Sequence, residues 1–212
     1  MKVLLINGSP HSNGNTADAL NYLAQNLEAN GLETETLWIG NKPVQGCIGC
    51  YKCMELGRCV FTDELYERTR LAISNADAIV IGSPTYYAGP AGSLCALLDR
   101  VFYSCGPLLR GKPAASVAIA RRGGATTTFD RLNKYFQIMG MPMPNSQYWT
   151  IAYGRRPGDV LLDAEGLQTL RNLAANMAWL LNAIAASPTP FPQREPWTPT
   201  HFIRPDLSPT NS

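Results

Sequence analysis

The stretch KVLLINGSPHSNGNT, from Lys2 to Thr16, decides the fold. Residues 2–7 form a continuous apolar run, which is typical of a strand buried on both faces in a parallel sheet. Residues 8–16 are mostly small and polar, and they lead into apolar residues at helical spacing from 17 to 27. A buried strand, a loop of small residues and an amphipathic helix predict the first βα unit of an α/β domain.

The same alternation continues along the chain. Further strands are predicted over 33–39, 78–82, 114–120 and 147–152. Helices are predicted over 17–27 with Gly31 as a C-terminal cap, 65–76 with Asp63 as N-cap, 90–102 opening at Pro90, 129–136 and 167–184. This order predicts one doubly wound domain over 1–186, with a five-stranded parallel sheet in a three-layer α/β/α sandwich. Its ligands belong at the carboxyl ends of the strands.

Residues 187–212 form a proline-rich tail that cannot continue a helix. The tail carries Trp197, Phe202 and Ile203, whose apolar side chains favour burial. Two alternatives remain open at this point: the tail lies against a partner subunit, or it is loose.

Composition narrows the class of protein. The 212 residues are 45% hydrophobic and 16% charged, as expected of a globular domain, and the net charge of +2 gives no reason to expect nucleic acid or a membrane as partner. No apolar run reaches the ~20 residues of a membrane span, and the N-terminal run is too short for a secretory signal. A cytoplasmic location follows as the expectation. In that compartment the six cysteines are better interpreted as ligands, catalysts or packing residues than as disulfides.

The loop at residues 8–16 has the composition of a phosphate site. Its side chains offer hydroxyl and amide donors at Ser9, Ser12, Asn15 and Thr16, and the following helix adds the positive end of its dipole. The lysine of a P-loop and the glycine pattern of a dinucleotide fold are both missing, which favours a phosphate monoester. An ordinary capped βα connection is the alternative. His11 either adds charge to the phosphate or is a solvent-exposed loop residue.

The segment GSPHSNGNTA resembles the phosphate loop of the NADPH-dependent FMN reductase family, within the flavodoxin-like superfamily. This resemblance covers about residues 1–185 and implies FMN as cofactor, with NAD(P)H as electron donor. His11 departs from it, because the family often has arginine there. The implied contacts to the FMN phosphate are Ser9, His11, Ser12, Gly14, Asn15 and Thr16.

Two further loops carry the resemblance. Residues 83–90 match a Ser-Pro-x-Tyr loop that holds the isoalloxazine, which implies flavin contacts from Pro84, Thr85, Tyr86 and Tyr87. After the fourth strand, Gly123 and Gly124 are favoured over the neighbouring arginines, 121 and 122, as contacts to the other edge of the flavin. The pair at 99–100 fits the family's Asp-Arg, whereas Cys95 replaces its frequent lysine.

The cysteines of CIGCYKCMELGRC, residues 47–59, follow the spacing C-x2-C-x2-C-x5-C. The first three repeat the spacing of bacterial ferredoxins, whereas zinc sites more often pair two separated C-x2-C knuckles. The motif resembles that of iron–sulfur flavoproteins, which implies a [4Fe–4S] cluster on Cys47, Cys50, Cys53 and Cys59. The alternative is a loop kept for its shape, with some cysteines buried. Cys95 and Cys105 are interpreted as core or helix-end thiols.

These features together favour an FMN-dependent NAD(P)H oxidoreductase that passes electrons to a small acceptor such as a quinone or flavin, directly or through the cluster. No side chain is expected to act as a catalytic acid or base. The alternatives are an iron–sulfur flavoprotein electron carrier reduced by ferredoxin, and a flavin- or zinc-binding protein without turnover. The resemblance further implies a homodimer or homotetramer.

Overall fold

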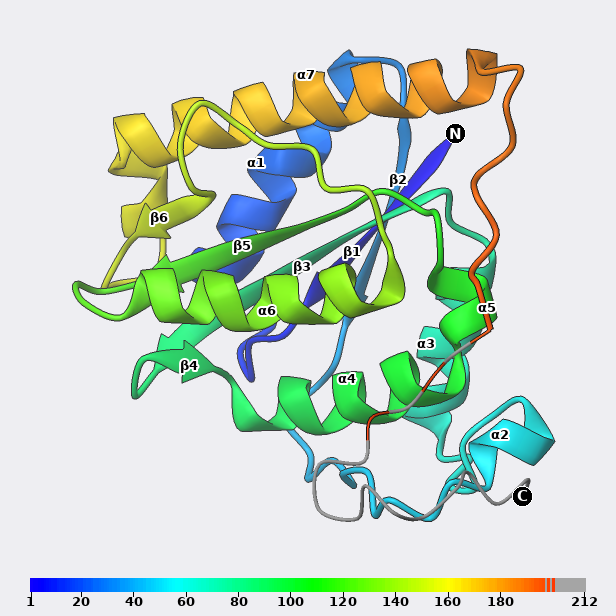
Figure 1. The fold of residues 1–212 in the computed structure, drawn as a ribbon. Helices are drawn as coiled ribbons and strands as arrows, with labels where there is room; N and C mark the ends of the chain where they lie inside the picture. Colours follow the sequence, from blue (N-terminus) through cyan, green and yellow to red (C-terminus); the bar gives the residue numbers. More distant parts are fainter. Residues whose placement is uncertain (197, 199, 201–212) are drawn as a thin grey trace.

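The computed structural model describes residues 1–196, 198 and 200, and its centre is a parallel sheet (Figure 1). Its strands are β1 (Lys2–Asn7), β2 (Glu33–Trp38), β3 (Ala78–Tyr86), β5 (Ala114–Ala120) and β6 (Ile151–Tyr153), in the order β2-β1-β3-β5-β6. A short β4 (Gly89–Pro90) pairs antiparallel with the end of β3. This is the flavodoxin-like, doubly wound, five-stranded sheet that the sequence predicts.

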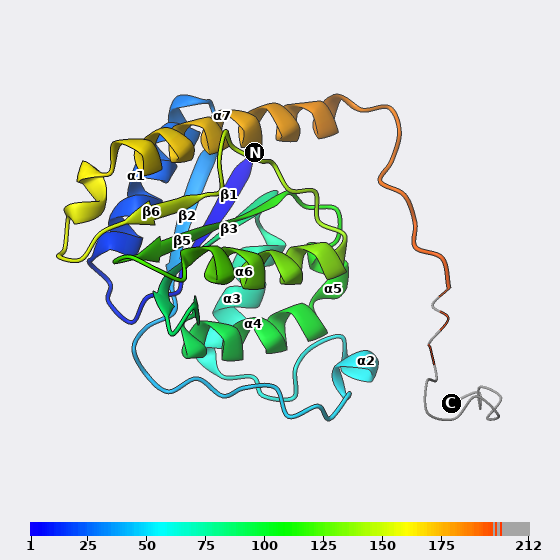
Figure 2. The same ribbon diagram turned by 60° about the vertical axis from the view of Figure 1, so that its left-hand side comes forward.

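Helices cover both faces of the sheet (Figures 1 and 2). They are α1 (Asn15–Ala29), α2 (Cys53–Leu56), α3 (Glu64–Ser74), α4 (Gly92–Ser104), α5 (Gly106–Leu109), α6 (Ala125–Met139) and α7 (Ala164–Ala186), with a 3₁₀ turn η1 (Asp159–Leu162). None of the helices in the described part of the chain is both long and apolar enough to cross a membrane.

The alternation of side chains along the buried strands divides the core in two. Val3 and Leu5 of β1 pack in one cluster with α1 and α7, whereas Leu4 and Ile6 pack in another with α3, α4 and α6. Each of these side chains is at most 1% exposed, and full burial of such a side chain stabilises the fold by roughly 1.5–3 kcal/mol. The sheet is therefore the middle layer of three.

The fifth predicted strand is shorter than expected. The sequence predicts a strand over 147–152, but regular pairing with β5 covers only Ile151–Tyr153. The preceding residues are drawn toward α7 instead: Asn172 donates to the Gln147 side chain at 2.7 Å, and Asn176 donates to the Asn145 carbonyl at 2.6 Å. Tertiary hydrogen bonds thus override a local strand pattern.

The predicted helix start at Pro90 is wrong. Pro90 belongs to β4, where it pairs with Thr85, and α4 begins two residues later at Gly92. The strand pair closes through Tyr87 and Ala88, which both adopt left-handed backbone conformations, with φ of 50° and 58°. Two consecutive left-handed residues make the tight turn of a hairpin, and neither residue type signals it in the sequence.

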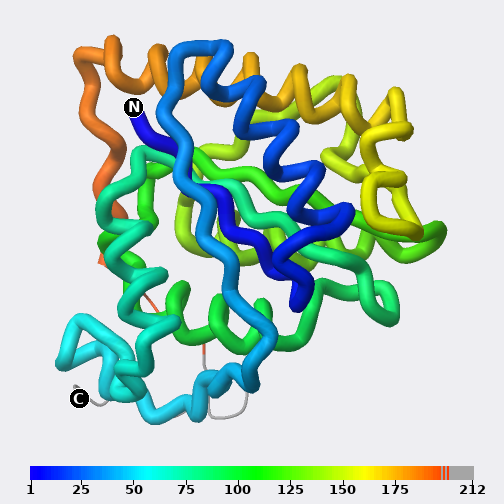
Figure 3. Tube along the Cα trace, turned by 180° about the vertical axis from the view of Figure 1, so that it is seen from behind, coloured from blue at the N-terminus to red at the C-terminus, as the bar shows by residue number. Residues whose placement is uncertain are grey.

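The described part of the tail is exposed and contacts its own domain at two side chains, Phe191 and Arg194. After α7 the chain turns and runs past α5, as seen from behind in Figure 3. The guanidinium carbon of Arg110 lies 4.9 Å from the ring centroid of Phe191, and Arg194 donates to the Ile138 carbonyl at 2.7 Å. Trp197, Phe202 and Ile203 lie outside the described residues.

Candidate functional site

A cavity of about 390 Å³ opens at the carboxyl ends of the strands, beside the switch in strand order between β1 and β3. This is the position where doubly wound sheets bind their ligands, and the volume suits a small molecule. Four segments form its walls: the loop after β1, the end of β3, the end of β5 and the loop after β6. The lining residues are Ser9, His11, Asn13, Gly14, Asn15, Thr16, Pro84, Thr85, Tyr86, Ile119, Ala120, Arg121, Gly154, Arg155 and Pro157.

Hydrogen bonds from behind hold the loop after β1 in place. The Ser9 N–H donates to the side-chain oxygen of buried Asn7 at 3.0 Å, and the Gly8 N–H donates to the Gly82 carbonyl at 2.8 Å. A side chain at position 8 has no room, because a Cβ there would lie 2.4 Å from Leu94. The Ser9 hydroxyl accepts from the His11 N–H at 3.1 Å, so its own proton remains available for a ligand.

The first turn of α1 makes one end of the cavity suitable for an anion. No side chain caps this helix, so its first N–H groups are open to a ligand. The one acidic residue of this turn, Asp18, accepts a hydrogen bond from the Gly158 N–H at 3.2 Å. The charged or basic residues in the lining are His11, Arg121 and Arg155, all suited to a negative group.

Asn15 has a second role besides lining the cavity. Its side-chain oxygen accepts the Val160 N–H at 3.1 Å, which holds the loop after β6 against the start of α1. Gly154 in that loop approaches so closely that an added Cβ would lie 2.7 Å from the Asn15 side chain. Asn15 therefore joins two walls of the cavity.

The end of β3 forms the opposite wall. Of the four residues predicted to contact the flavin, Pro84, Thr85 and Tyr86 line the cavity, whereas Tyr87 is fully exposed outside the lining. The hydroxyl of Thr85 is buried and has no hydrogen-bond partner among the described residues. A buried polar group without a partner calls for an explanation, and a bound ligand supplies one.

Three other predicted contacts lie outside the lining. Ser12, Gly123 and Gly124 do not line the cavity, although they belong to loops that form it. Gly124 adopts a left-handed conformation with φ of 87°, and an added Cβ would lie 2.9 Å from the Ala88 Cα. It thus supports the hairpin of β3 and β4 from outside.

Sequence reasoning missed part of the lining. Asn13 lies inside the predicted phosphate loop. The others lie at the end of β5 or follow β5 and β6, so the rule that ligands bind at the carboxyl ends of strands was the signal that could have found them. They are Ile119, Ala120, Arg121, Gly154, Arg155 and Pro157.

The arrangement fits FMN. An uncapped helix N-terminus with basic residues suits the terminal phosphate, and the wall at Pro84–Tyr86 offers an aromatic ring and the unpartnered Thr85 hydroxyl to the flavin. A larger cavity of about 490 Å³ lies between β5 and residues 143–150, where no charged side chain contributes to the lining. That cavity suits an anionic cofactor poorly.

The cysteine loop, residues 47–59, lies between β2 and α3 and passes below α4 in Figure 1. Cys47 and Cys50 are exposed, whereas Cys53 and Cys59 are partly buried. The Cys53 thiol contacts the Tyr103 carbonyl at 3.8 Å, and the Cys59 N–H donates to the Tyr66 hydroxyl at 2.9 Å. The half of the loop that packs on the domain is therefore the one with Cys53 and Cys59.

Four thiols on one loop are a suitable donor set for an iron–sulfur cluster. Burial raises the pKa of the Cys53 thiol, and the charges of the other three cysteines raise it further. Within the described residues, however, no three His, Cys, Asp or Glu side chains converge into a metal-binding group. The assignment of these cysteines as ligands stays a prediction.

Comparisons with known proteins agree with this picture. Residues 1–155 match the NADPH-dependent FMN reductase family. An iron–sulfur flavoprotein of Methanocaldococcus jannaschii is 36% identical over 196 residues, which cover 87% of this chain and 99% of that protein.

Two solved structures share the fold. RosB, with bound 8-demethyl-8-formylriboflavin-5′-phosphate, superposes with a TM-score of 0.69 at 18% identity, over 89% of this chain and 82% of its own. The apo form of an NADH:FMN oxidoreductase superposes with a TM-score of 0.64 at 19% identity, over 88% of this chain and 91% of its own.

Proposed function

The chain belongs to the NADPH-dependent FMN reductase family, and on that premise we propose that it is an FMN-dependent oxidoreductase. It takes electrons from NAD(P)H and passes them to a small acceptor such as a quinone or a free flavin. The observation that carries this proposal is the cavity at the carboxyl ends of β1, β3 and β5, with the uncapped start of α1 at one end and Thr85 at the other.

The residues of this cavity have distinct tasks in the proposal. The first N–H groups of α1 and the hydroxyls of Ser9 and Thr16 bind the phosphate, and His11 faces the same group. Pro84, Thr85 and Tyr86 orient the flavin ring. When bound, FMN supplies the redox chemistry, because it accepts electrons in pairs and releases them in pairs or singly.

The cysteine loop adds a second centre to the proposal. Cys47, Cys50, Cys53 and Cys59 would hold a [4Fe–4S] cluster, which supplies one-electron transfer. The support is the set of four free thiols on one loop and the name of the relative, an iron–sulfur flavoprotein. No cysteine lines the FMN cavity, so the two centres occupy separate parts of the chain.

A second candidate is an electron carrier reduced by ferredoxin. The exposure of Cys47 and Cys50 favours it, because the same stretch also exposes the apolar side chains of Ile48 and Met54 to a protein partner. Small exposed apolar surfaces of this kind are usual where electron-transfer proteins meet briefly.

The deciding experiment uses protein purified without oxygen. FMN, iron, acid-labile sulfide and zinc are measured per chain, and the bound flavin is then titrated with NADH and with NADPH under argon. The proposal expects one FMN, about four irons and four sulfides, and bleaching of the flavin by at least one nucleotide. Flavin that neither nucleotide bleaches, but that reduced ferredoxin bleaches, would favour the carrier. Zinc in place of iron, with no turnover, would leave only a binding protein.

The proposal includes a cytoplasmic location and a homo-oligomer. All six cysteines are unpaired in the structure, as expected in a reducing compartment. Apolar side chains at the surface, such as Ile138 and Trp179 at 70% exposure each, are available for contacts between copies. Light scattering after gel filtration measures the oligomeric state, and a monomer at micromolar concentration would contradict the proposed oligomer.

A further inference from the structure

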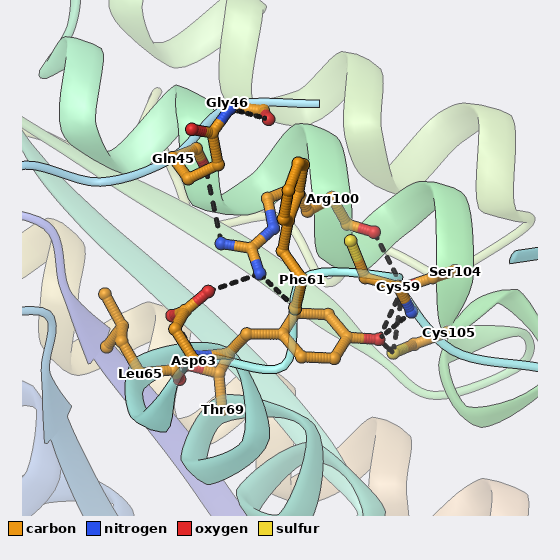
Figure 4. Close-up of polar contacts among 11 residues, drawn as sticks. Gln45, Gly46, Cys59, Phe61, Asp63, Leu65, Thr69, Arg100, Ser104 and Cys105 are labelled. Atoms are coloured by element: carbon orange, nitrogen blue, oxygen red, sulfur yellow. Dashed lines mark hydrogen bonds and ion pairs between the residues drawn. The ribbon is translucent and has the colours of Figure 1, made fainter. Parts of the chain in front are cut away.

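Arg100 lies on α4, and its side chain is completely buried beneath the cysteine loop (Figure 4). Its Nη1 donates to the Gln45 carbonyl at 3.3 Å, and its Nη2 donates to the Phe61 carbonyl. Position 45 precedes the first cysteine of the loop and position 61 follows the last. A single guanidinium on a core helix therefore ties both ends of the loop together.

Among the described residues, the acidic group that pairs with this guanidinium is Asp63. Nη2 also pairs with the carboxylate of Asp63 at 2.5 Å, but the Asp63 side chain is 45% exposed whereas that of Arg100 is not exposed at all. Water screens the exposed carboxylate more effectively than the buried cation. The exposed Asp63 carboxylate therefore offsets the buried charge of Arg100 only in part.

Two features show that Arg100 faces the loop and not only the core. Its Nε is buried and has no hydrogen-bond partner among the described residues, and Figure 4 shows the thiol of Cys59 beside the Arg100 side chain. The ring of Tyr66 lies under the guanidinium at 4.9 Å, and the Tyr66 hydroxyl accepts the Cys59 N–H. Tyr66 thus holds the backbone of Cys59 at the place where the cysteine thiol lies beside Arg100.

Stability alone does not account for this arrangement. A buried ion pair often gives no more stability than apolar side chains of the same volume, because both charges lose hydration. Phe61 and Tyr66 pack against the guanidinium. The Gln45 and Phe61 carbonyls need a donor, but a neutral amide would serve them as well, so these hydrogen bonds do not by themselves require a charge. A positive charge at this place has its clearest use next to thiolate ligands.

We propose that Arg100 is the positioning residue of the cysteine loop: it fixes both ends of the loop and holds a positive charge beside Cys59 that favours the reduced state of a cluster bound there. The inference rests on the proposed [4Fe–4S] cluster. Because reduction adds a negative charge to the cluster, a fixed cation nearby raises its midpoint potential.

The test compares four variants of the full chain, reconstituted without oxygen with FMN, iron and sulfide. Arg100→Met removes the charge at similar volume, and Arg100→Lys keeps the charge but loses the two separate guanidinium donors. Asp63→Asn removes the counter-charge while retaining a cap for α3. Arg70→Met is the control, because Arg70 is a part-exposed arginine on α3 that pairs with Glu67. Bound FMN per chain reports folding at the separate cavity, and a redox titration followed by electron paramagnetic resonance gives the cluster potential.

The expected result is a fall of about tenfold in the equilibrium constant for cluster reduction in Arg100→Met, which equals 59 mV for one electron. Asp63→Asn is expected to raise the potential, Arg100→Lys to restore most of the wild-type value, and Arg70→Met to leave it unchanged. Unchanged potentials in both Arg100→Met and Asp63→Asn, with the cluster bound, overturn the inference and leave the proposed function intact.

Failure of the proposed cluster gives a different result. If the wild-type chain takes up FMN but no iron, it forms no cluster, and the inference is overturned. If Arg100→Met binds no FMN and is therefore misfolded, Asp63→Asn decides: a rise in potential supports the inference, and no change overturns it.

Discussion

Replacing Tyr66 with phenylalanine isolates the hydrogen bonds that anchor the cysteine loop to the core. Tyr66 is fully buried, and its hydroxyl accepts the Cys59 N–H at 2.9 Å and lies 2.7 Å from the Ser104 hydroxyl. Ser104 donates its proton to the Arg100 carbonyl at 2.7 Å, so Tyr66 must be the donor to Ser104. The substitution keeps the ring under Arg100 and removes one acceptor and one donor.

The cost follows from these two bonds. Each buried hydrogen bond contributes about 1 kcal/mol, so the free energy of unfolding should fall by about 2 kcal/mol. With a urea m-value of about 2 kcal/mol/M, the unfolding midpoint should fall by about 1 M. Urea titrations of the FMN-free protein avoid the stabilisation that a bound ligand adds.

Tyr148→Phe serves as the control, because the Tyr148 side chain is 56% exposed and its hydroxyl is accessible to water. Its midpoint should stay within about 0.2 M of wild type, since surface substitutions cost at most ~0.5 kcal/mol. A Tyr66→Phe midpoint equal to that of wild type would refute the idea that this hydroxyl anchors the loop.

The remaining predictions concern the FMN cavity and the charge of Asp63. Thr85→Val should weaken FMN binding about three- to tenfold by removing the unpartnered buried hydroxyl, measured by flavin fluorescence, and equal affinity would show that the hydroxyl does not meet the cofactor. Gly124→Ala should weaken FMN binding about tenfold, because a left-handed alanine is strained and its Cβ would push on Ala88. Gly123→Ala is the matched control, since its methyl meets no protein atom within 4 Å and any weakening there reports direct contact with the flavin. Burial raises the pKa of Asp63, but hydrogen bonds from Arg100 and the Tyr66 N–H outweigh it and leave that pKa below its ordinary value. The resulting stability is present above the unfolded pKa of about 3.9 and is lost as the pH falls through the folded value, so the urea midpoint of wild type should drop more between pH 6 and pH 3 (chosen to bracket about 3.9) than that of Asp63→Asn.

Most of the sheet is predictable because its strands are locally distinctive. Residues 2–7 and 114–120 are mostly apolar, and the structure has β1 and β5 over the same residues. Asp63 is confirmed as the N-cap of α3, where its side chain accepts the Tyr66 N–H. Errors arise where a distant segment decides the conformation, as at residues 145–147, where the Asn145 carbonyl and the Gln147 side chain accept hydrogen bonds from α7.

The candidate site, too, is predictable where one contiguous segment forms it and not where distant segments do. The phosphate loop is a contiguous segment with a recognisable composition, and five of its six predicted contacts line the cavity. Apart from Asn13, the missed lining residues come from the end of β5 and from the loops after β5 and β6, whose own sequence gives no sign of a ligand. In the sequence, Arg121 is the less favoured candidate beside Gly123 and Gly124, and no pattern singles out Arg155, yet both line the cavity.

Asn15 shows why such residues escape prediction. In the sequence it is a small polar residue at a helix start, and that pattern suggests only a donor to the phosphate. In the structure its side-chain oxygen holds the Val160 N–H, 145 positions later, and its bulk requires a glycine at 154. The wall after β6 therefore depends on a residue of the phosphate loop, so the two sides of the cavity assemble together. A cavity built in this way becomes visible only when the long-range contacts are known, however clear its separate loops are in the sequence.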